Sequence, residues 1–267
     1  MKLFAKSKRF IVLCSLITLV AGITPGKTVE RVDPGSFVYD ERLQYTVTYL
    51  GIRIGTIEML NKYDQDGKDS VKESHITLRT FSGIPFLSVY TEFYSKLGSD
   101  GFFTESVTFD RERNNWAYYL AIREDRSTDI IIDRGYQDRK NGTIFDVEID
   151  TLQLDEPVHD ALTFLSILRA SARTGHALEL DVLIDRSVEK IKIEPPENIE
   201  KIGVPAFDNK IEAYHVNGVI DFTAIHGLTR EYQSWISKDE YQIPLEGRVR
   251  IGIGSIKIRL EEYEYIR

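Results

Sequence analysis

The sequence predicts a mainly β protein in which a strongly curved antiparallel sheet, or an open barrel, wraps one long central helix. Two observations lead to this prediction. Apolar and polar residues alternate in many short segments, and a single longer segment has an apolar stripe at helical spacing. No Pro-rich or Ser-rich linker and no repeat follows residue 22. Residues 23–267 are therefore expected to form a single β-rich domain.

The alternation that predicts strands is clearest in a segment whose apolar residues are Leu43, Tyr45, Val47 and Tyr49. Gly51 and Gly55 favour a turn or bend after it. Asn141-Gly142 predicts a type I′ hairpin turn, because this turn needs two residues that tolerate positive φ. Further strands are expected at 75–81, 89–94, 105–109, 116–122, 129–133, 136–139, 143–147, 178–183, 188–193, 211–220, 229–236 and 256–260.

The expected helix covers about residues 155–174. Asp155 can cap its start, Pro157 suits its first turn, and Gly175 suits its end. Its apolar residues fall at i, i+3, i+4, i+7 and i+10, namely Val158, Ala161, Leu162, Leu165 and Leu168. We expect this stripe to pack against the sheet, with the two central leucines, Leu162 and Leu165, among the most buried side chains.

Residues 1–22 are typical of a secretory signal peptide. Four basic residues precede an uncharged apolar run, 10–23, whose 14 residues are fewer than the ~20 needed to span a bilayer. Cleavage is expected after Gly22, with Gly26 as the alternative, and an uncleaved anchor stays open. We therefore expect an exported, periplasmic protein with no transmembrane span after cleavage; association with the outer membrane is also open.

The cysteine content and the net charge exclude several kinds of site and partner. Cys14, the only cysteine, lies inside the apolar run, so the mature chain cannot form disulfides or use thiolates. Cleavage changes the formal net charge from −8 to −12, because the leader carries four positive and no negative charges. We expect no nucleic-acid partner, since phosphate binding needs a basic face.

The sequence contains no evident catalytic constellation. The five histidines have no spacing typical of a zinc site, so no metal is expected, and no Gly-x-Ser-x-Gly motif supplies a nucleophile. No complete dinucleotide motif indicates a cofactor. Acidic residues between 146 and 156 leave open an enzyme that acts on cell-wall glycans, but the sequence does not fix the separation of any two carboxylates.

An apolar ligand site between sheet and helix is the main functional hypothesis. Its candidate residues are Tyr45, Tyr49, Trp116, Tyr118, Leu162, Leu165 and Trp235. Core packing is the alternative for aromatic residues in strands. Trp235 also shares one strand face with Ser237 and Asp239. For these two polar residues a turn network ahead of Pro244 is favoured over a ligand site, because Asp commonly accepts backbone N–H bonds in turns.

Three segments resemble a known family. ERLQYTVTYLGIRIG at 41–55 is similar to its opening strand, DALTFLSILR at 160–169 to its helix, and 235–260 to its closing strands. Thr163 stands where the family usually has Ser. The chain thus resembles the bacterial envelope domain-of-unknown-function family 3108. The resemblance implies structural roles for Asp160, Arg169, Trp235, Ser237, Asp239, Pro244 and Gly254.

The resemblance also implies an exported protein with a curved sheet similar to the half-barrels that carry lipoproteins across the periplasm. It implies no activity. Three functions stay open: non-enzymatic binding of a hydrophobic small molecule such as a lipid or lipoprotein-like ligand, a scaffold or assembly factor that binds envelope proteins, and an enzyme acting on cell-wall glycans. The export signal, the β-rich pattern and the missing catalytic constellation favour the first.

Overall fold

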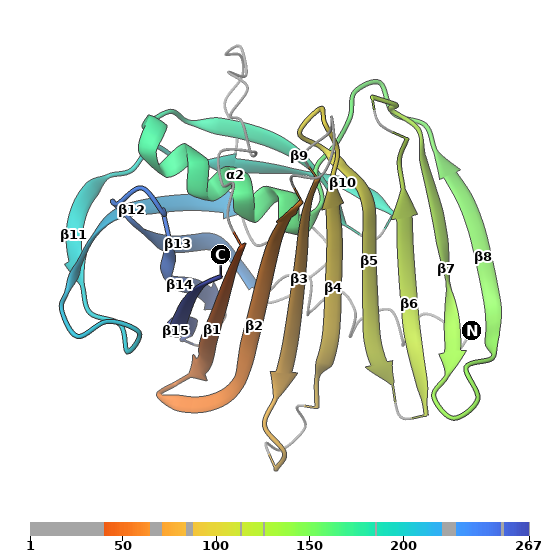
Figure 1. The fold of residues 1–267 in the computed structure, drawn as a ribbon, viewed down its shortest axis with the longest axis horizontal. Coiled ribbons are helices and arrows are strands. Elements are labelled where there is room, and N and C mark those ends of the chain that lie inside the picture. Colours follow the sequence, from red (N-terminus) through yellow and green to blue (C-terminus); the bar gives the residue numbers. More distant parts are fainter. Residues whose placement is uncertain are drawn as a thin grey trace.

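In the part of the chain that the structure describes, fifteen strands form one large, curved and unclosed antiparallel sheet that holds a helix, α2, on its concave side (Figure 1). This confirms the predicted fold class. The computed structural model describes residues 40–64, 71–83, 88–112, 114–124, 126–184, 186–220, 228–251 and 254–266. The expected signal peptide, 1–22, lies outside these residues. No helix in the described ranges is long and apolar enough to cross a membrane.

The first half of the sheet is a meander in which each strand pairs with the next. Figure 1 shows it curving past α2, with the later strands extending beyond the helix as a wall. Its strands are β1 (Asp40–Tyr49), β2 (Ile52–Asp64), β3 (Val71–Thr80), β4 (Tyr90–Leu97), β5 (Phe103–Glu112), β6 (Asn115–Ile122), β7 (Ile130–Asp138) and β8 (Ile144–Leu152).

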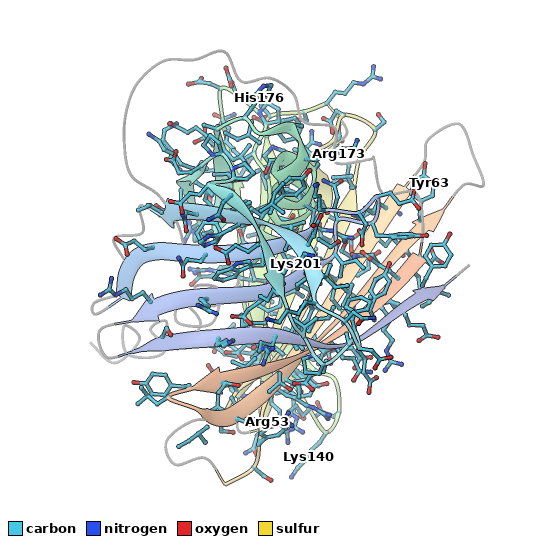
Figure 2. All side chains as sticks on the ribbon, turned by 90° about the vertical axis from the view of Figure 1, so that its left-hand side faces the viewer. Arg53, Tyr63, Lys140, Arg173, His176 and Lys201 are labelled. Atoms are coloured by element: carbon cyan, nitrogen blue, oxygen red, sulfur yellow. The ribbon has the colours of Figure 1, made fainter. Side chains whose placement is uncertain are left out.

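The second half of the sheet follows the helix and returns to the first strand, because β15 pairs with β1. The order runs from β8 through β1, β15, β14, β13, β12 and β10 to β9, so β8 and β9 are the two ends. In Figure 2, Lys201 marks β11, which pairs with β12 at the front of this half. Its strands are β9 (Leu178–Ile184), β10 (Ser187–Ile193), β11 (Asn198–Ile202), β12 (Ile211–Ile220), β13 (Leu228–Ser237), β14 (Pro244–Ile251) and β15 (Ser255–Ile266).

The helix α2 (Ala161–Thr174) starts later than predicted. Asp160, not Asp155, is its N-cap, and the Asp160 side chain accepts a bond from the backbone N–H of Thr163 at 2.8 Å. The preceding residues cannot join the helix, because the backbone of His159 pairs with β9 as an isolated parallel bridge to Val182. The predicted end is correct, since Gly175 caps the helix in the left-handed region with φ 71°.

The helix is a central element rather than a surface one. Ten of its residues are buried, including polar residues on the side away from the predicted stripe. Leu162 is buried as expected, whereas Leu165 is only partly buried and packs between two core clusters. Val158 lies before the helix but is buried against β5, β6 and β7. The prediction for Leu165 was therefore wrong in degree, because Leu165 faces a cavity between α2 and the sheet.

The Asn141-Gly142 hairpin is present, but its turn is not type I′. Only Gly142 has positive φ, 73°, and the Asp138 N–H donates to Thr143 O across a longer loop. The Asp138 side chain accepts the backbone N–H groups of Lys140 and Asn141, which stabilises this loop. The residues 129–133 and 136–139, predicted as two strands, form the single strand β7 with a register shift between Arg134 and Tyr136.

Three strands have no counterpart of matching extent in the prediction: β2, β11 and β14. The turn after β1 has Gly51 at φ 81°, but Gly55 lies within β2. A Cβ added at Gly55 would lie 2.4 Å from Arg79 O, so glycine here allows β3 to approach β2 closely. The second glycine therefore belongs to strand pairing and not to a bend.

Candidate functional site

The strongest candidate site is a cavity of about 130 Å³ between α2 and the concave face of the sheet. One wall comes from the meander, because the register places Tyr45 opposite Ile57 and Met59 opposite Ile76 on that face. The helix contributes Leu162, Phe164 and Leu165, and the far wall comes from β13 and β14 with Tyr232, Ile236 and Val249. The arrangement suits an apolar group, since most of the lining is hydrocarbon.

One end of the cavity is polar. The sheet register aligns Glu41 of β1, Asn61 of β2 and Ser74 of β3 on the concave face, one step beyond the apolar row. The Ser74 hydroxyl donates to Asn61 Oδ1 at 2.7 Å, and the Asn61 amide donates to Glu41 Oε1 at 2.7 Å. Asn61, Ser74 and Ser166 of α2 line this end. The cavity therefore has a hydrogen-bonding end, and the wall from β13 and β14 adds the polar residues Ser234, Glu246 and Arg248 to its mainly apolar lining.

A buried ion pair joins the helix to this polar end. The Arg169 guanidinium forms an ion pair with Glu41, and the two side chains are only 3% and 1% exposed. Arg169 Nε also donates to Gln242 O at 3.0 Å and Nη2 to Tyr241 O at 2.9 Å. Because Glu41 and the bond to Gln242 O are buried, the pair fixes α2 to β1 and to the turn between β13 and β14.

Ser237 and Asp239, the two polar residues predicted to form a turn network, build the turn between β13 and β14. The Ser237 hydroxyl donates to Asp239 Oδ1 at 2.7 Å and accepts the Ile243 N–H at 2.7 Å. The same Asp239 oxygen accepts the N–H groups of Tyr241 and Gln242. Gln242, whose φ is 46°, returns its side-chain amide to Arg169 O at 2.8 Å. This hydrogen-bond network fixes the turn whose carbonyl groups accept hydrogen bonds from Arg169.

Lys72 is the least expected residue of the site. Its side chain points to the concave face from β3, is 5% exposed, and donates from Nζ to Ser166 Oγ at 3.0 Å. Burial, reinforced by the nearby positive charge of Arg169, lowers the pKa of Lys72 to about 7, and Glu41 opposes this shift only in part. Lys72 therefore changes its charge near neutral pH.

The structure brings three of the seven predicted ligand residues to the cavity. Tyr45, Leu162 and Leu165 line it, and the Tyr45 hydroxyl donates to Pro244 O at 3.0 Å. Burial raises the pKa of Tyr45 strongly, so its phenol stays neutral. Tyr49 lies at the hairpin end of β1, opposite Ile52, and is not part of the lining.

Trp116 and Tyr118 lie on the opposite, convex face of the sheet. They pair with Arg111 and Phe109, which alternate with residues of the concave face. Tyr118 lines a separate hollow of about 600 Å³ on that face, and its hydroxyl donates to Asp133 at 2.9 Å. The sequence hypothesis that grouped both aromatic residues with Tyr45 in one site was therefore wrong.

Trp235 is also absent from the cavity lining. Its ring stacks on His215 with centroids 4.5 Å apart, and the Arg248 guanidinium covers the ring 4.5 Å from the centroid. The indole N–H donates to Glu200 at 3.0 Å. These contacts from β12, β14 and β11 hold the side chain in the packing between strands, so the structural role is the one that the geometry supports.

Pro244 and Gly254 have structural positions as well. Pro244 begins β14 and presents its carbonyl to Tyr45. Gly254, with φ 81°, precedes β15, and a Cβ there would lie 2.7 Å from Leu50 Cδ2. Within the described ranges no group of three or more His, Cys, Asp or Glu residues is placed to hold a metal ion.

Several residues of the polar end were missed by the sequence analysis: Glu41 as an ion-pair partner, Asn61, Lys72, Ser74 and Ser166. The sequence did contain a signal for two of them. Lys72 and Ser74 are in phase with Ile76 and Leu78, so the period of two residues places all four on one strand face. A lysine in phase with a buried apolar row indicates an inward charge.

The family described as Protein of unknown function (DUF3108) matches residues 44–261. The chain belongs to this family. The three DUF3108-like segments meet at the polar end of the cavity: Glu41 comes from the first, Arg169 from the second, and the turn at 239–243 from the third. Residues far apart in this DUF3108 protein thus form one buried contact.

Two solved structures resemble this DUF3108 protein. A β-barrel-like protein of the domain of unknown function DUF1849 from Brucella abortus has 10% sequence identity and a TM-score of 0.54, covering 86% of this chain and 98% of its own. A protein from Bacteroides fragilis, described as exported with a YmcC-like fold, has 7% identity and a TM-score of 0.39, covering 92% and 99%. The first likeness supports the fold alone. None of the curated proteins matches the chain.

Proposed function

We propose that this protein is a non-enzymatic binding protein that holds an apolar ligand in the cavity between α2 and the sheet. The observation that carries the proposal is the cavity itself, a mainly apolar space bordered by residues of two buried core clusters. Protein interiors are close-packed, and voids larger than a water molecule are few. An apolar cavity of this size is suited to a hydrocarbon group.

The size of the cavity limits the ligand. Its volume of about 130 Å³ is close to the ~150 Å³ of an engineered cavity that binds benzene. It therefore accommodates an apolar group of roughly six carbon atoms without rearrangement. The ion pair of Arg169 with Glu41 holds α2 over this space, so a larger ligand requires the helix to shift.

Filling the cavity should abolish binding. In Leu165→Phe the larger side chain occupies the space from the helix, and in Val249→Phe it does so from β14. With 1-hexanol as the probe in isothermal titration calorimetry, we expect saturable one-site binding to the unmodified protein and a loss of affinity of about tenfold or more in either variant.

The matched control is Ile167→Val. Ile167 lies on the same helix, is 2% exposed, and is absent from the cavity lining, so its substitution should leave 1-hexanol affinity unchanged. Thermal unfolding monitored for each variant separates a filled cavity from a lost fold. Absence of binding to the unmodified protein, or equal affinity in a folded Leu165→Phe variant, would show that the cavity is not a ligand site.

Export to the periplasm is part of the proposal. The basic and apolar pattern of residues 1–22 supports a cleaved leader, which leaves 23–267 as one β-rich domain. Association with the outer membrane is compatible with the same leader. The intact mass of the protein recovered from a periplasmic extract tests this; a mass that includes residues 1–22 would contradict it.

A role in envelope assembly is the second candidate, and the end strand β8 favours it. Its residues 144–151 are exposed, among them Ile144, Phe145, Val147 and Ile149, and β8 ends the strand order. An apolar strand at a sheet end can pair with an extended segment of another protein. Copurification of a stoichiometric envelope protein without a small ligand would favour this candidate.

A further inference from the structure

One hydroxyl in the cavity lining has no protein partner. Tyr232 of β13 lines the cavity and is 8% exposed, and its hydroxyl forms no hydrogen bond with the part of the chain that the structure describes. Tyr232 is paired with Val249 of β14, another lining residue, so its ring lies on the concave face. Buried polar groups of proteins nearly always have a hydrogen-bond partner, because an unpaired one is costly. A ligand can supply the partner that Tyr232 lacks.

Other hydroxyls of the lining already bond to the protein. Tyr45 is buried in the same cavity, but its hydroxyl donates to Pro244 O at 3.0 Å. At the polar end, the Ser74 hydroxyl donates to Asn61 Oδ1 at 2.7 Å. The hydroxyl of Tyr232 differs from both, because its hydrogen-bonding capacity is unused.

The charges around the cavity favour a neutral ligand. Each charged residue of the lining has an oppositely charged partner: Arg169 pairs with Glu41, and Glu246 Oε1 lies 2.6 Å from Arg248 Nε. A charged ligand group would lose its hydration on entering the cavity, and it would find these partners already taken. A neutral polar group is removed from water at a much lower cost.

The chemistry of β13 selects the polar group of the ligand. Burial, reinforced by the negative charge of Glu194, raises the pKa of Tyr232 strongly, so its phenol stays neutral and keeps a proton to donate. Ser234 lies two residues farther on the same strand face and also lines the cavity. Because a serine hydroxyl both donates and accepts, a ligand oxygen near β13 can accept from Tyr232 with Ser234 as a second partner.

We propose that the ligand is a small neutral molecule with an apolar body and one accepting oxygen, of a carbonyl or an alcohol, which takes the hydrogen bond of the Tyr232 hydroxyl. Its apolar body lies toward Phe164 and Leu165 of α2. This inference rests on the proposed function and names the ligand class of the same cavity. Covalent chemistry is not involved, because the ligand is held by a hydrogen bond and apolar contact.

The test compares two six-carbon rings: cyclohexanone, which has an accepting oxygen, and benzene, which has none. Titration calorimetry uses the unmodified protein, Tyr232→Phe and the matched control Tyr45→Phe, which removes a hydroxyl from the same cavity. We expect Tyr232→Phe to weaken cyclohexanone binding by about fivefold or more, as for one lost hydrogen bond, and to leave benzene affinity within about twofold. In Tyr45→Phe the ratio of the two affinities should stay within about twofold of its original value, because that hydroxyl is bonded to the protein.

Thermal unfolding without ligand gives a second readout. Tyr232→Phe removes an unpaired buried hydroxyl, so its melting temperature should equal or exceed that of the unmodified protein. Tyr45→Phe leaves Pro244 O without its donor and should melt at a lower temperature. A fall for Tyr232→Phe as large as that for Tyr45→Phe, or larger, would show that the Tyr232 hydroxyl has a protein partner and would overturn the inference.

The outcomes separate the two proposals. If cyclohexanone, benzene and 1-hexanol all fail to bind the unmodified protein, the cavity is not a ligand site and the proposed function fails. If the two rings bind but Tyr232→Phe changes their affinities equally, or changes neither, the cavity is a ligand site and only the accepting oxygen is disproved. Binding of benzene without cyclohexanone would disprove that oxygen as well.

Discussion

Replacing Arg169 with methionine should lower the free energy of unfolding by about 3 to 5 kcal/mol. The substitution leaves the carboxylate of Glu41 buried without its cation, and it removes the donors to Gln242 O and Tyr241 O. An uncompensated buried charge is costly because water cannot reach it. Urea unfolding followed by circular dichroism measures the change.

Two further variants show whether the ion pair is the cause. Arg42→Met removes a neighbouring pair with Glu58, whose side chains are 42% and 48% exposed, and should cost less than about 1 kcal/mol. Adding Glu41→Gln to Arg169→Met removes the stranded charge and should recover part of the loss. A cost below about 1 kcal/mol for Arg169→Met alone would show that the pair does not hold the helix.

The free energy of unfolding should increase as the pH rises, because buried Lys72 then loses its charge. Its pKa is about 7 in the folded protein and near 10.5 when exposed. Between these values the unfolded chain binds the proton more strongly, so the free energy of unfolding increases with pH. The slope approaches about 1.4 kcal/mol per pH unit, and it vanishes below the folded pKa and above the unfolded one.

Comparison with Lys72→Met isolates this contribution, because the other titrating groups are common to both proteins. Arg169 from α2 and Glu41 from β1 are the charged groups that set the pKa of Lys72, and both stay in place in the variant. Urea unfolding between pH 6 and 9 should show the stability of the unmodified protein rising relative to the variant. A difference that does not change with pH would show that Lys72 stays charged in the folded state.

The strands could be predicted because their local pattern and their burial agree. Leu43, Tyr45 and Val47 alternate with polar residues in the sequence and are all buried in the structure. The helix start could not be predicted, since Asp155 and Pro157 are good local start signals. A long-range contact decided it: the backbone of His159 pairs with β9.

The site was predictable only in part. The period of two residues tells which side chains share a face within one strand, but not which face encloses the helix. Tyr45 and Trp116 were therefore grouped, although the fold places them on opposite faces. The ion pair of Glu41 with Arg169 joins residues 128 positions apart, a distance over which no local pattern applies.

Native mass spectrometry of the protein recovered from a periplasmic extract tests the central claim most directly. The account predicts a chain that begins near Ile23 and carries one small bound apolar molecule, which dissociates when the protein unfolds. The same spectrum of Leu165→Phe should show the chain without this ligand. A bare unmodified chain that stays bare after incubation with 1-hexanol would contradict the account.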